Sequence, residues 1–165
     1  MKDYAQVVEL LRHAKLWKLT PHLINRPGYY HTQLLYQGLS ALILARQTGE
    51  SHWRETGEEA VRLARGFEKL SKWNFEHRAR LLEAELHYLD GNVALAGPAY
   101  IAAIESACAH KHLNHEALAL ELYGTYLVEN GGAVDGVEKL KLAMEKYESW
   151  GAMPKVDQMR RSLAL

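Results

Sequence analysis

The fold is decided by residues 74–155, which read NFEHRARLLEAELHYLDGNVALAGPAYIAAIESACAHKHLNHEALALELYGTYLVENGGAVDGVEKLKLAMEKYESWGAMPK. Gly91 and Gly131 each follow a helix-length run of residues, and they lie 40 positions apart. Small and large apolar residues recur at the same offset, in the pairs Leu82 and Leu122, Ala84 and Gly124, Ala96 and Gly136, Tyr100 and Leu140, and Ala103 and Ala143. A period of about 20 to 50 residues is typical of stacked helical repeats. The stretch therefore predicts two consecutive helical hairpins, residues 74–112 and 114–151, in which the second repeats the first.

Helical periodicity continues on both sides of these hairpins, and alternating strand patterns are absent from the sequence. The predicted helices cover residues 3–18, 29–47, 53–72, 74–89, 93–110, 114–129, 134–150 and 154–163. The sequence thus predicts an all-α protein, a single domain over residues 1–165. Its about eight helices form an array of antiparallel hairpins, an α-solenoid, which the helix at 154–163 caps.

The fifth predicted helix contains an internal conflict. Gly97 and Pro98 lie within its expected first two turns, and a proline in a helix interior costs about 3 kcal/mol. A proline in the first turn is harmless. The helix therefore either starts near Pro98 or is kinked there, and of the two we expect the late start, with residues 93–96 as a loose turn leading into it.

The composition favours a protein of the cytoplasm that binds neither nucleic acid nor membranes. Twenty basic and twenty acidic residues cancel, so no net charge attracts nucleic acid or an anionic lipid surface. The single cysteine, Cys108, cannot form an internal disulfide, which fits a reducing compartment. The first residues carry charges throughout and predict no signal peptide. The longest nearly apolar run, residues 39–45, is far short of the roughly 20 residues of a membrane span.

The second hairpin resembles a tetratricopeptide unit. Its small and large residues stand at the spacings of that family, at Leu120, Tyr123, Gly124, Leu127, Gly136, Leu140 and Ala143. Small residues at two of these positions let the helices approach closely while the large ones fill the space around the crossing. The first hairpin departs from the pattern at Glu83, where an apolar residue is usual, and the period of 40 exceeds the standard tetratricopeptide length.

A longer string of residues resembles the helical-repeat region of large multidomain signalling proteins. Its pieces are Asn74–His77, Leu81–Leu86, Gly91, Tyr100, Ala103-Ile104, Glu116–Ala119, Glu121-Leu122, Tyr147, Trp150–Ala152 and Lys155-Val156. In that family a kinase-like domain and a signal-transduction ATPase precede this region, and sensor histidine-kinase domains often follow. This chain has neither a glycine-rich phosphate loop followed by lysine nor a kinase catalytic loop. The resemblance implies a connecting and interaction module that is not an enzyme, with no catalytic residues.

Histidines gather at His110, His112 and His115, followed by Glu116. Neutral imidazoles at these positions could bind zinc or copper. The spacing matches no established zinc signature, and a polar turn between two helices explains it as well. We therefore predict no metal and no cofactor, and keep the three histidines as weak metal candidates.

Other polar and aromatic residues are interpreted as structural. Glu85 is expected to be buried and to hold a neighbouring helix by hydrogen bonds, with Glu121 acting likewise in the next repeat. Tryptophans at helix ends are expected to close the core, namely Trp17, Trp53, Trp73 and Trp150. Cys108 is expected to be a small buried residue, whereas Tyr29 and Tyr30 are the best candidates for surface aromatics.

The predicted function is protein–protein interaction or signal relay without catalysis. The partner is a protein, a peptide or a neighbouring domain, which lies on a concave face with Tyr30, His77, Arg80, His87 and Glu121 as its contact residues. Two alternatives stay open. One is an enzyme or small-molecule sensor with a pocket between the second and fourth helices. The other is a homodimer formed through the first or the last helix.

Overall fold

The computed structural model describes residues 27–163, and these residues form seven α-helices and no strand. The predicted helix at 3–18, with Trp17, lies outside the described residues. The helices are α2 (Pro27–Thr48), α3 (Ser51–Leu70), α4 (Lys72–Leu89), α5 (Val93–Ala109), α6 (Leu113–Glu129), α7 (Ala133–Ser149) and α8 (Met153–Leu163). The all-α prediction is confirmed for this part of the chain.

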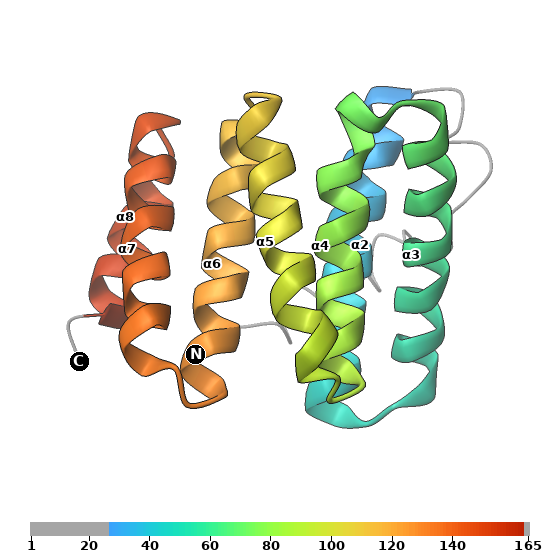
Figure 1. Ribbon diagram of the computed structural model, residues 1–165, viewed down its shortest axis with the longest axis horizontal. Coiled ribbons are helices and arrows are strands. Elements are labelled where there is room, and N and C mark those ends of the chain that lie inside the picture. The colour runs from blue at the N-terminus through green and yellow to red at the C-terminus, as the bar shows by residue number, and fades with distance from the viewer. Residues whose placement is uncertain (1–26, 164–165) are drawn as a thin grey trace.

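Each helix packs against the next one along the chain, and short turns make consecutive helices antiparallel (Figure 1). The helices stand side by side in a row, with α2 and α3 near one end and α7 and α8 at the other (Figure 1). Helix α4 contacts α2, α3, α5 and α6, and therefore lies at the centre of the largest apolar core. No helix within residues 27–163 combines the length and the apolar character that crossing a bilayer requires.

Four successive corners share one backbone geometry, spaced 20 residues apart. A residue in the left-handed conformation follows α4, α5, α6 and α7, and the N–H after it bonds the carbonyl five positions earlier, as expected for a Schellman turn. The left-handed residues are Gly91 (φ 68°), Lys111 (φ 59°), Gly131 (φ 88°) and Gly151 (φ 83°). The closing bonds are 2.8 to 2.9 Å long, from Asn92, His112, Gly132 and Ala152 to His87, Ala107, Leu127 and Tyr147. Gly91 and Gly131 thus occupy equivalent corners.

Helices α6 and α7 approach closely where two glycines face each other. A Cβ atom on Gly124 would lie 2.8 Å from the carbonyl oxygen of Gly136, and one on Gly136 would lie 2.7 Å from the carbonyl oxygen of Gly124. Both distances are shorter than a carbon and an oxygen tolerate, so neither position accepts a side chain without movement. The prediction that small residues here allow a close crossing is confirmed.

The expected late start of the fifth helix is wrong. Helix α5 begins at Val93, and Pro98 lies inside it. Pro98 and the residue one turn before it, Ala94, are both exposed, so water can bond the carbonyl that the proline leaves without a donor. The preceding residue, Gly97, has no Cβ to clash with the proline ring. The helix therefore passes through this point.

Three expectations about single side chains are also corrected. Trp53 is buried as predicted, but Trp73 and Trp150 are mainly exposed. Trp73 lies in the first turn of α4 and Trp150 follows the last residue of α7, so both extend past the ends of the core. Cys108 is exposed rather than buried, because it lies on the outward side of α5.

Candidate functional site

The five residues predicted to form a binding face do not share an exposed surface. Tyr30, His77 and Glu121 are 7%, 2% and 3% exposed, so they belong to the interior. The ring of Tyr30 packs edge-on against Phe67 at 5.8 Å, which corrects its expected place at the surface. A partner cannot contact these three side chains directly.

The two remaining residues of that set, Arg80 and His87, are partly exposed. The guanidinium of Arg80 lies 3.6 to 3.9 Å from the carboxylates of Glu68, Glu76 and Glu83. The pair with Glu68 connects α4 to α3, whereas Glu76 and Glu83 lie on α4 itself, so Arg80 already has a structural role.

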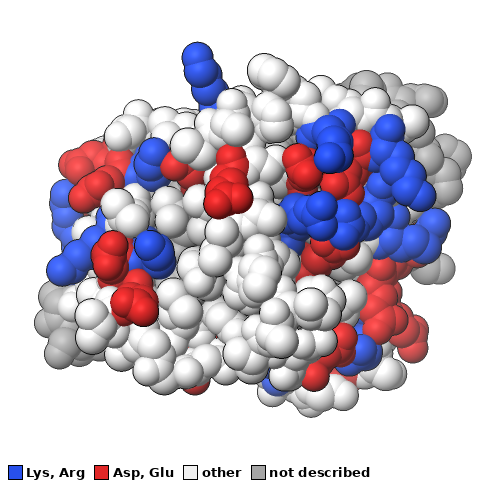
Figure 2. Space-filling model, in the orientation of Figure 1, with Lys and Arg blue, Asp and Glu red and all other residues white. Residues whose placement is uncertain are grey.

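The outer face of α5 is exposed and almost free of charge. It consists of five residues spaced three or four apart, which we call the α5 stripe: Ala94, Pro98, Ile101, Glu105 and Cys108. Ile101 is 43% exposed, and nearby Val93 and Leu95 at the start of the helix are about half exposed. Figure 2 shows the same face, where few charged side chains cover the region of α5 and many gather on either side.

The equivalent outer face in the next repeat, on α7, is mostly charged. At the offset of 40, α7 has five exposed residues: Val134, Glu138, Lys141, Glu145 and Glu148. The backbone position is the same in both repeats, but four of five residues are charged on α7 and one of five on α5. An outward-facing helix surface in water is usually polar. The α5 stripe is therefore an exception that packing within residues 27–163 does not explain.

A second candidate site, which is polar, lies where the starts of α4 and α6 meet. Nε2 of His77, on α4, is 2.8 Å from Nδ1 of His115, on α6. The ring of His112, which directly precedes α6, stacks on that of His77 with 4.4 Å between centroids. One ligand atom from each of the three rings lies within 4.8 Å of the other two. We call these three side chains the histidine cluster.

The sequence singled out two members of this cluster and missed the third. His110 turns away, with its Nδ1 2.9 Å from the carbonyl oxygen of Ser106 and its ring beside Trp73. His77, on α4, is the third member of the cluster instead of His110. A signal was available, because the 40-residue repeat places the starts of α4 and α6 side by side, and His77 and His115 are 38 positions apart.

Burial keeps the rings of His77 and His115 neutral. Desolvation is the main cause that lowers the pKa of His77 to about 2, and the neighbouring His115 and His112 also contribute to this decrease. Desolvation also lowers the pKa of His115 to about 3, with Arg78 as the second cause. At neutral pH these two imidazoles are therefore unprotonated, and each has a nitrogen lone pair that can bind a metal ion.

Two buried carboxylates connect helices, as the sequence predicted. Glu85 accepts a hydrogen bond of 2.6 Å from the Tyr100 hydroxyl and one of 2.9 Å from Arg46. Glu121 accepts bonds of 3.0 Å from the Tyr147 hydroxyl and 2.9 Å from Lys155. Both carboxylates are thus satisfied within the fold, which favours a structural role over general acid–base chemistry.

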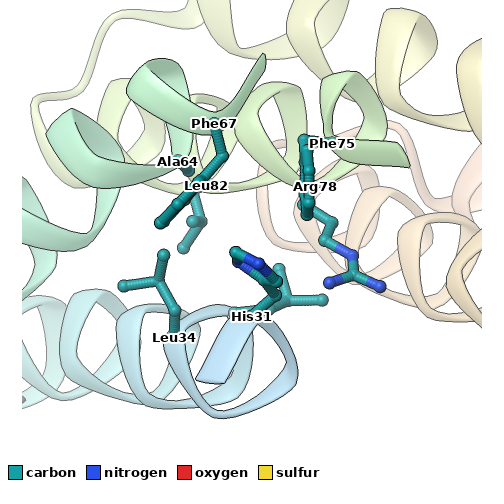
Figure 3. A pocket seen from close by; sticks show the side chains of 8 residues that line it. His31, Leu34, Ala64, Phe67, Phe75, Arg78 and Leu82 are labelled. Atoms are coloured by element: carbon teal, nitrogen blue, oxygen red, sulfur yellow. The ribbon is translucent and has the colours of Figure 1, made fainter. Parts of the chain in front are cut away.

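The hollow between α2, α3 and α4 is too small for a metabolite. Its labelled lining residues converge from all three helices, with His31 and Arg78 as the polar ones (Figure 3). The space measures about 10 Å³, which is room for about one water molecule. This hollow therefore leaves no room for the small molecule that the sequence-based alternative placed between the second and fourth helices.

A larger groove lies between α6, α7 and α8. Its volume is about 390 Å³, and its walls carry apolar residues that include Val128, Leu140 and Met159. Lys155 and Glu121 form an ion pair at its edge. The volume falls within the roughly 300–1,000 Å³ of small-molecule sites.

Comparisons with known proteins give no relative from which a function could be inferred. No protein-family model, no curated protein and no solved structure matches the chain. The α5 stripe, the histidine cluster and the groove are therefore the basis for assigning a function.

Proposed function

We propose that this protein is a non-catalytic scaffold of tetratricopeptide-like helical repeats whose α5 stripe binds a helix of a partner protein. The observation that carries the proposal is the difference between α5 and α7. Equivalent exposed positions hold Ala94, Pro98 and Ile101 in one repeat but Val134, Glu138 and Lys141 in the next. Exposed apolar patches of this kind mark interaction surfaces.

The repeated corners support the scaffold part of the proposal. Left-handed residues at 91, 111, 131 and 151 turn the chain after each of α4, α5, α6 and α7 with the same hydrogen bond. Helices joined in this way form an array in which each unit packs on its neighbours. In the proposed role the array binds a partner and catalyses no reaction. In the cytoplasm, such an array connects signalling proteins or the domains of a longer chain.

The chemistry of the stripe defines the partner. An amphipathic helix of the partner lies along α5 with its apolar face on Pro98 and Ile101. Glu105, the one charge in the stripe, has no ion-pair partner within residues 27–163. The partner helix therefore carries a lysine or arginine opposite Glu105.

The test replaces one apolar residue of the stripe by the residue that α7 carries at the same position. The variant is Ile101→Lys, because position 141 on α7 is Lys141. Purified wild-type and variant chains serve as bait in extracts of the source cell, and bound proteins are identified by mass spectrometry. A partner bound through the stripe is captured at least tenfold less by the variant, as expected for a central apolar contact worth more than about 1.4 kcal/mol.

The matched control is Lys141→Glu, a charge change on the same outer face of the next repeat. It should leave capture unchanged, and the thermal midpoints of both variants should stay close to that of the wild type. A captured protein that does not distinguish Ile101→Lys from Lys141→Glu is not bound through the stripe. If this holds for every captured protein, the proposal is wrong.

Two other functions are distinguished by separate measurements. The groove of about 390 Å³ between α6, α7 and α8 favours a small-molecule sensor as the second candidate. Thermal-shift screening with a metabolite library detects such a ligand, and Met159→Trp would remove the response by filling the groove. Light scattering at several concentrations detects a homodimer, which Ile101→Lys would dissociate if two α5 stripes pair.

A further inference from the structure

The histidine cluster brings together three ring systems from two helices that are far apart in sequence. His77 comes from α4, and His112 and His115 from the start of α6. We propose that the cluster binds one divalent transition-metal ion through the three imidazoles, with zinc as the ion to test first. This site is separate from the α5 stripe, so the scaffold proposal and the metal proposal stand independently.

The distances are those of a site that closes on an ion by small side-chain movements. Zinc–nitrogen bonds of about 2.0–2.1 Å in a tetrahedral site place ligand atoms about 3.3 Å apart. The ligand atoms of the cluster lie within 4.8 Å of one another, and the closest pair, His77 Nε2 and His115 Nδ1, is 2.8 Å apart. The close pair must open by about half an ångström and the third ring must move inward.

The ligand set suits zinc, copper or nickel rather than calcium or magnesium. Neutral imidazole is a borderline-soft nitrogen ligand, whereas calcium and magnesium require oxygen. The three side chains that converge are all imidazoles, and no carboxylate belongs to the group found within residues 27–163. Three protein ligands leave a fourth position for water, as in open zinc sites.

The surroundings of His112 support an ion at this place. His112 is partly exposed and gives the ion a path from solvent. Its Nε2 lies 3.3 Å from the carbonyl oxygen of Trp73, so a proton on that nitrogen leaves Nδ1 as a ligand.

A hydrogen bond between two neutral imidazoles is the competing explanation of the close pair. In that state one proton lies between His77 and His115. When the ion binds, each of these two rings holds its proton on the nitrogen that faces away from the ion, and no proton is released. The hydrogen bond needs only His77 and His115, whereas the metal site also needs His112. Variants of His112 therefore separate the two explanations.

The experiment is titration of the untagged full chain with Zn²⁺ by isothermal calorimetry at pH 7.5, after dialysis against EDTA. We expect one ion per chain with a Kd of about 10 µM or lower, a free energy of about −7 kcal/mol at that limit. Excess Zn²⁺ raises the thermal midpoint because the ion binds only the folded chain. Co²⁺ in place of Zn²⁺ gives the visible absorption of a four-coordinate site.

The decisive variant is His112→Ala, in which a partly exposed ring is removed and the buried pair stays intact. It should weaken Zn²⁺ binding at least tenfold and abolish the thermal shift. The matched control is His110→Ala, which removes a ring two residues away that points to Ser106, and it should bind as the wild type does. Arg78→Gln should tighten binding. It removes a positive charge close to His77 and His115 that lowers the pKa of both rings and would repel a cation.

Either of two results overturns the proposal. One is the absence of saturable binding at one ion per chain up to about 100 µM Zn²⁺. The other is binding that His112→Ala leaves unchanged, which would assign the ion to other surface histidines.

Discussion

The hydroxyl of Tyr100 donates a hydrogen bond of 2.6 Å to Oε1 of Glu85, deep between α5 and α4. The other oxygen of the same carboxylate accepts 2.9 Å from Arg46 on α2. Glu85 therefore connects its own helix to two others, and burial raises the pKa of the Tyr100 hydroxyl, with Glu85 as the second cause.

Replacing Tyr100 by phenylalanine should destabilise the fold by about 1.5–3 kcal/mol, the range for hydrogen bonds to charged groups. The variant removes one donor and leaves a buried carboxylate with less compensation. Urea unfolding followed by circular dichroism measures the loss. Tyr88→Phe is the control, because Tyr88 donates to Glu129 at an exposed position and should cost less than about 1 kcal/mol. Equal losses in the two variants would contradict the structural role of Glu85.

Replacing glycine by alanine should have opposite effects at the α6–α7 crossing and on the exposed side of α3. Gly124→Ala places a Cβ 2.8 Å from the carbonyl oxygen of Gly136, so it should cost about 1–3 kcal/mol. Gly66 lies exposed on α3 with nothing within 4 Å of a Cβ, so Gly66→Ala should stabilise by about 0.5–1 kcal/mol through helix propensity. Thermal unfolding of both variants gives the sign. A stabilised Gly124→Ala would show that the helices are not closely packed there.

Lys111 has a left-handed backbone conformation, whereas the three equivalent corners, at positions 91, 131 and 151, have glycine. A non-glycine residue pays about 1–2 kcal/mol for it, and glycine is more flexible in the unfolded chain by about 0.5–1 kcal/mol. Lys111→Gly should therefore stabilise by about 0.5–1 kcal/mol. The reciprocal variant, Gly131→Ala, meets nothing within 4 Å of its Cβ and should cost about 1 kcal/mol through its backbone alone. Chemical unfolding that finds the two changes equal in sign would refute the equivalence of the corners.

The buried histidines predict a loss of stability in mild acid when EDTA keeps the chain metal-free. The folded-state pKa is about 2 for His77 and about 3 for His115, against about 6.5 in an unfolded chain. The unfolded state thus binds more protons below pH 6.5. Stability is complete above that value and decreases as the pH falls toward about 3, by at most about 1.4 kcal/mol per pH unit for each histidine.

Urea unfolding at pH 7.5, 6.5 and 5.5 measures this slope before most carboxylates titrate. His115→Gln removes one of the two groups, so the decrease between pH 6.5 and 5.5 should be about half that of the wild type. A wild-type free energy of unfolding that is constant over this range would mean that the two rings are not buried in solution.

Local chemistry made part of the fold predictable. The glycines at 91 and 131 marked two corners because glycine adopts positive φ without strain, and Gly124 and Gly136 marked the close crossing because they lack side chains. The corner at Lys111 was not predictable, since lysine rarely takes this conformation and only the packing of the flanking helices holds it there. The same applies to Pro98, where exposure to water decides whether a helix continues.

The candidate site residues also divide into those that the sequence identified and those that it missed. Glu85 and Glu121 were identified as buried helix-connecting carboxylates, because an isolated charge on an apolar helix face needs partners. The pairing of His77 with His115 and the exposure of Cys108 were missed, since both depend on which side of a helix turns toward a neighbour.

By itself, the sequence determined the helices, their approximate limits and the repeated turn every 40 residues, because periodicity and glycine act within a few residues of chain. Only the tertiary structure decided which of those helix faces are covered. Burial of an α-helix depends on the neighbours that lie against it, and these come from 20 to 40 positions away along the chain. That is why His77 lies inside with His115 while Ile101 and Cys108 face the solvent.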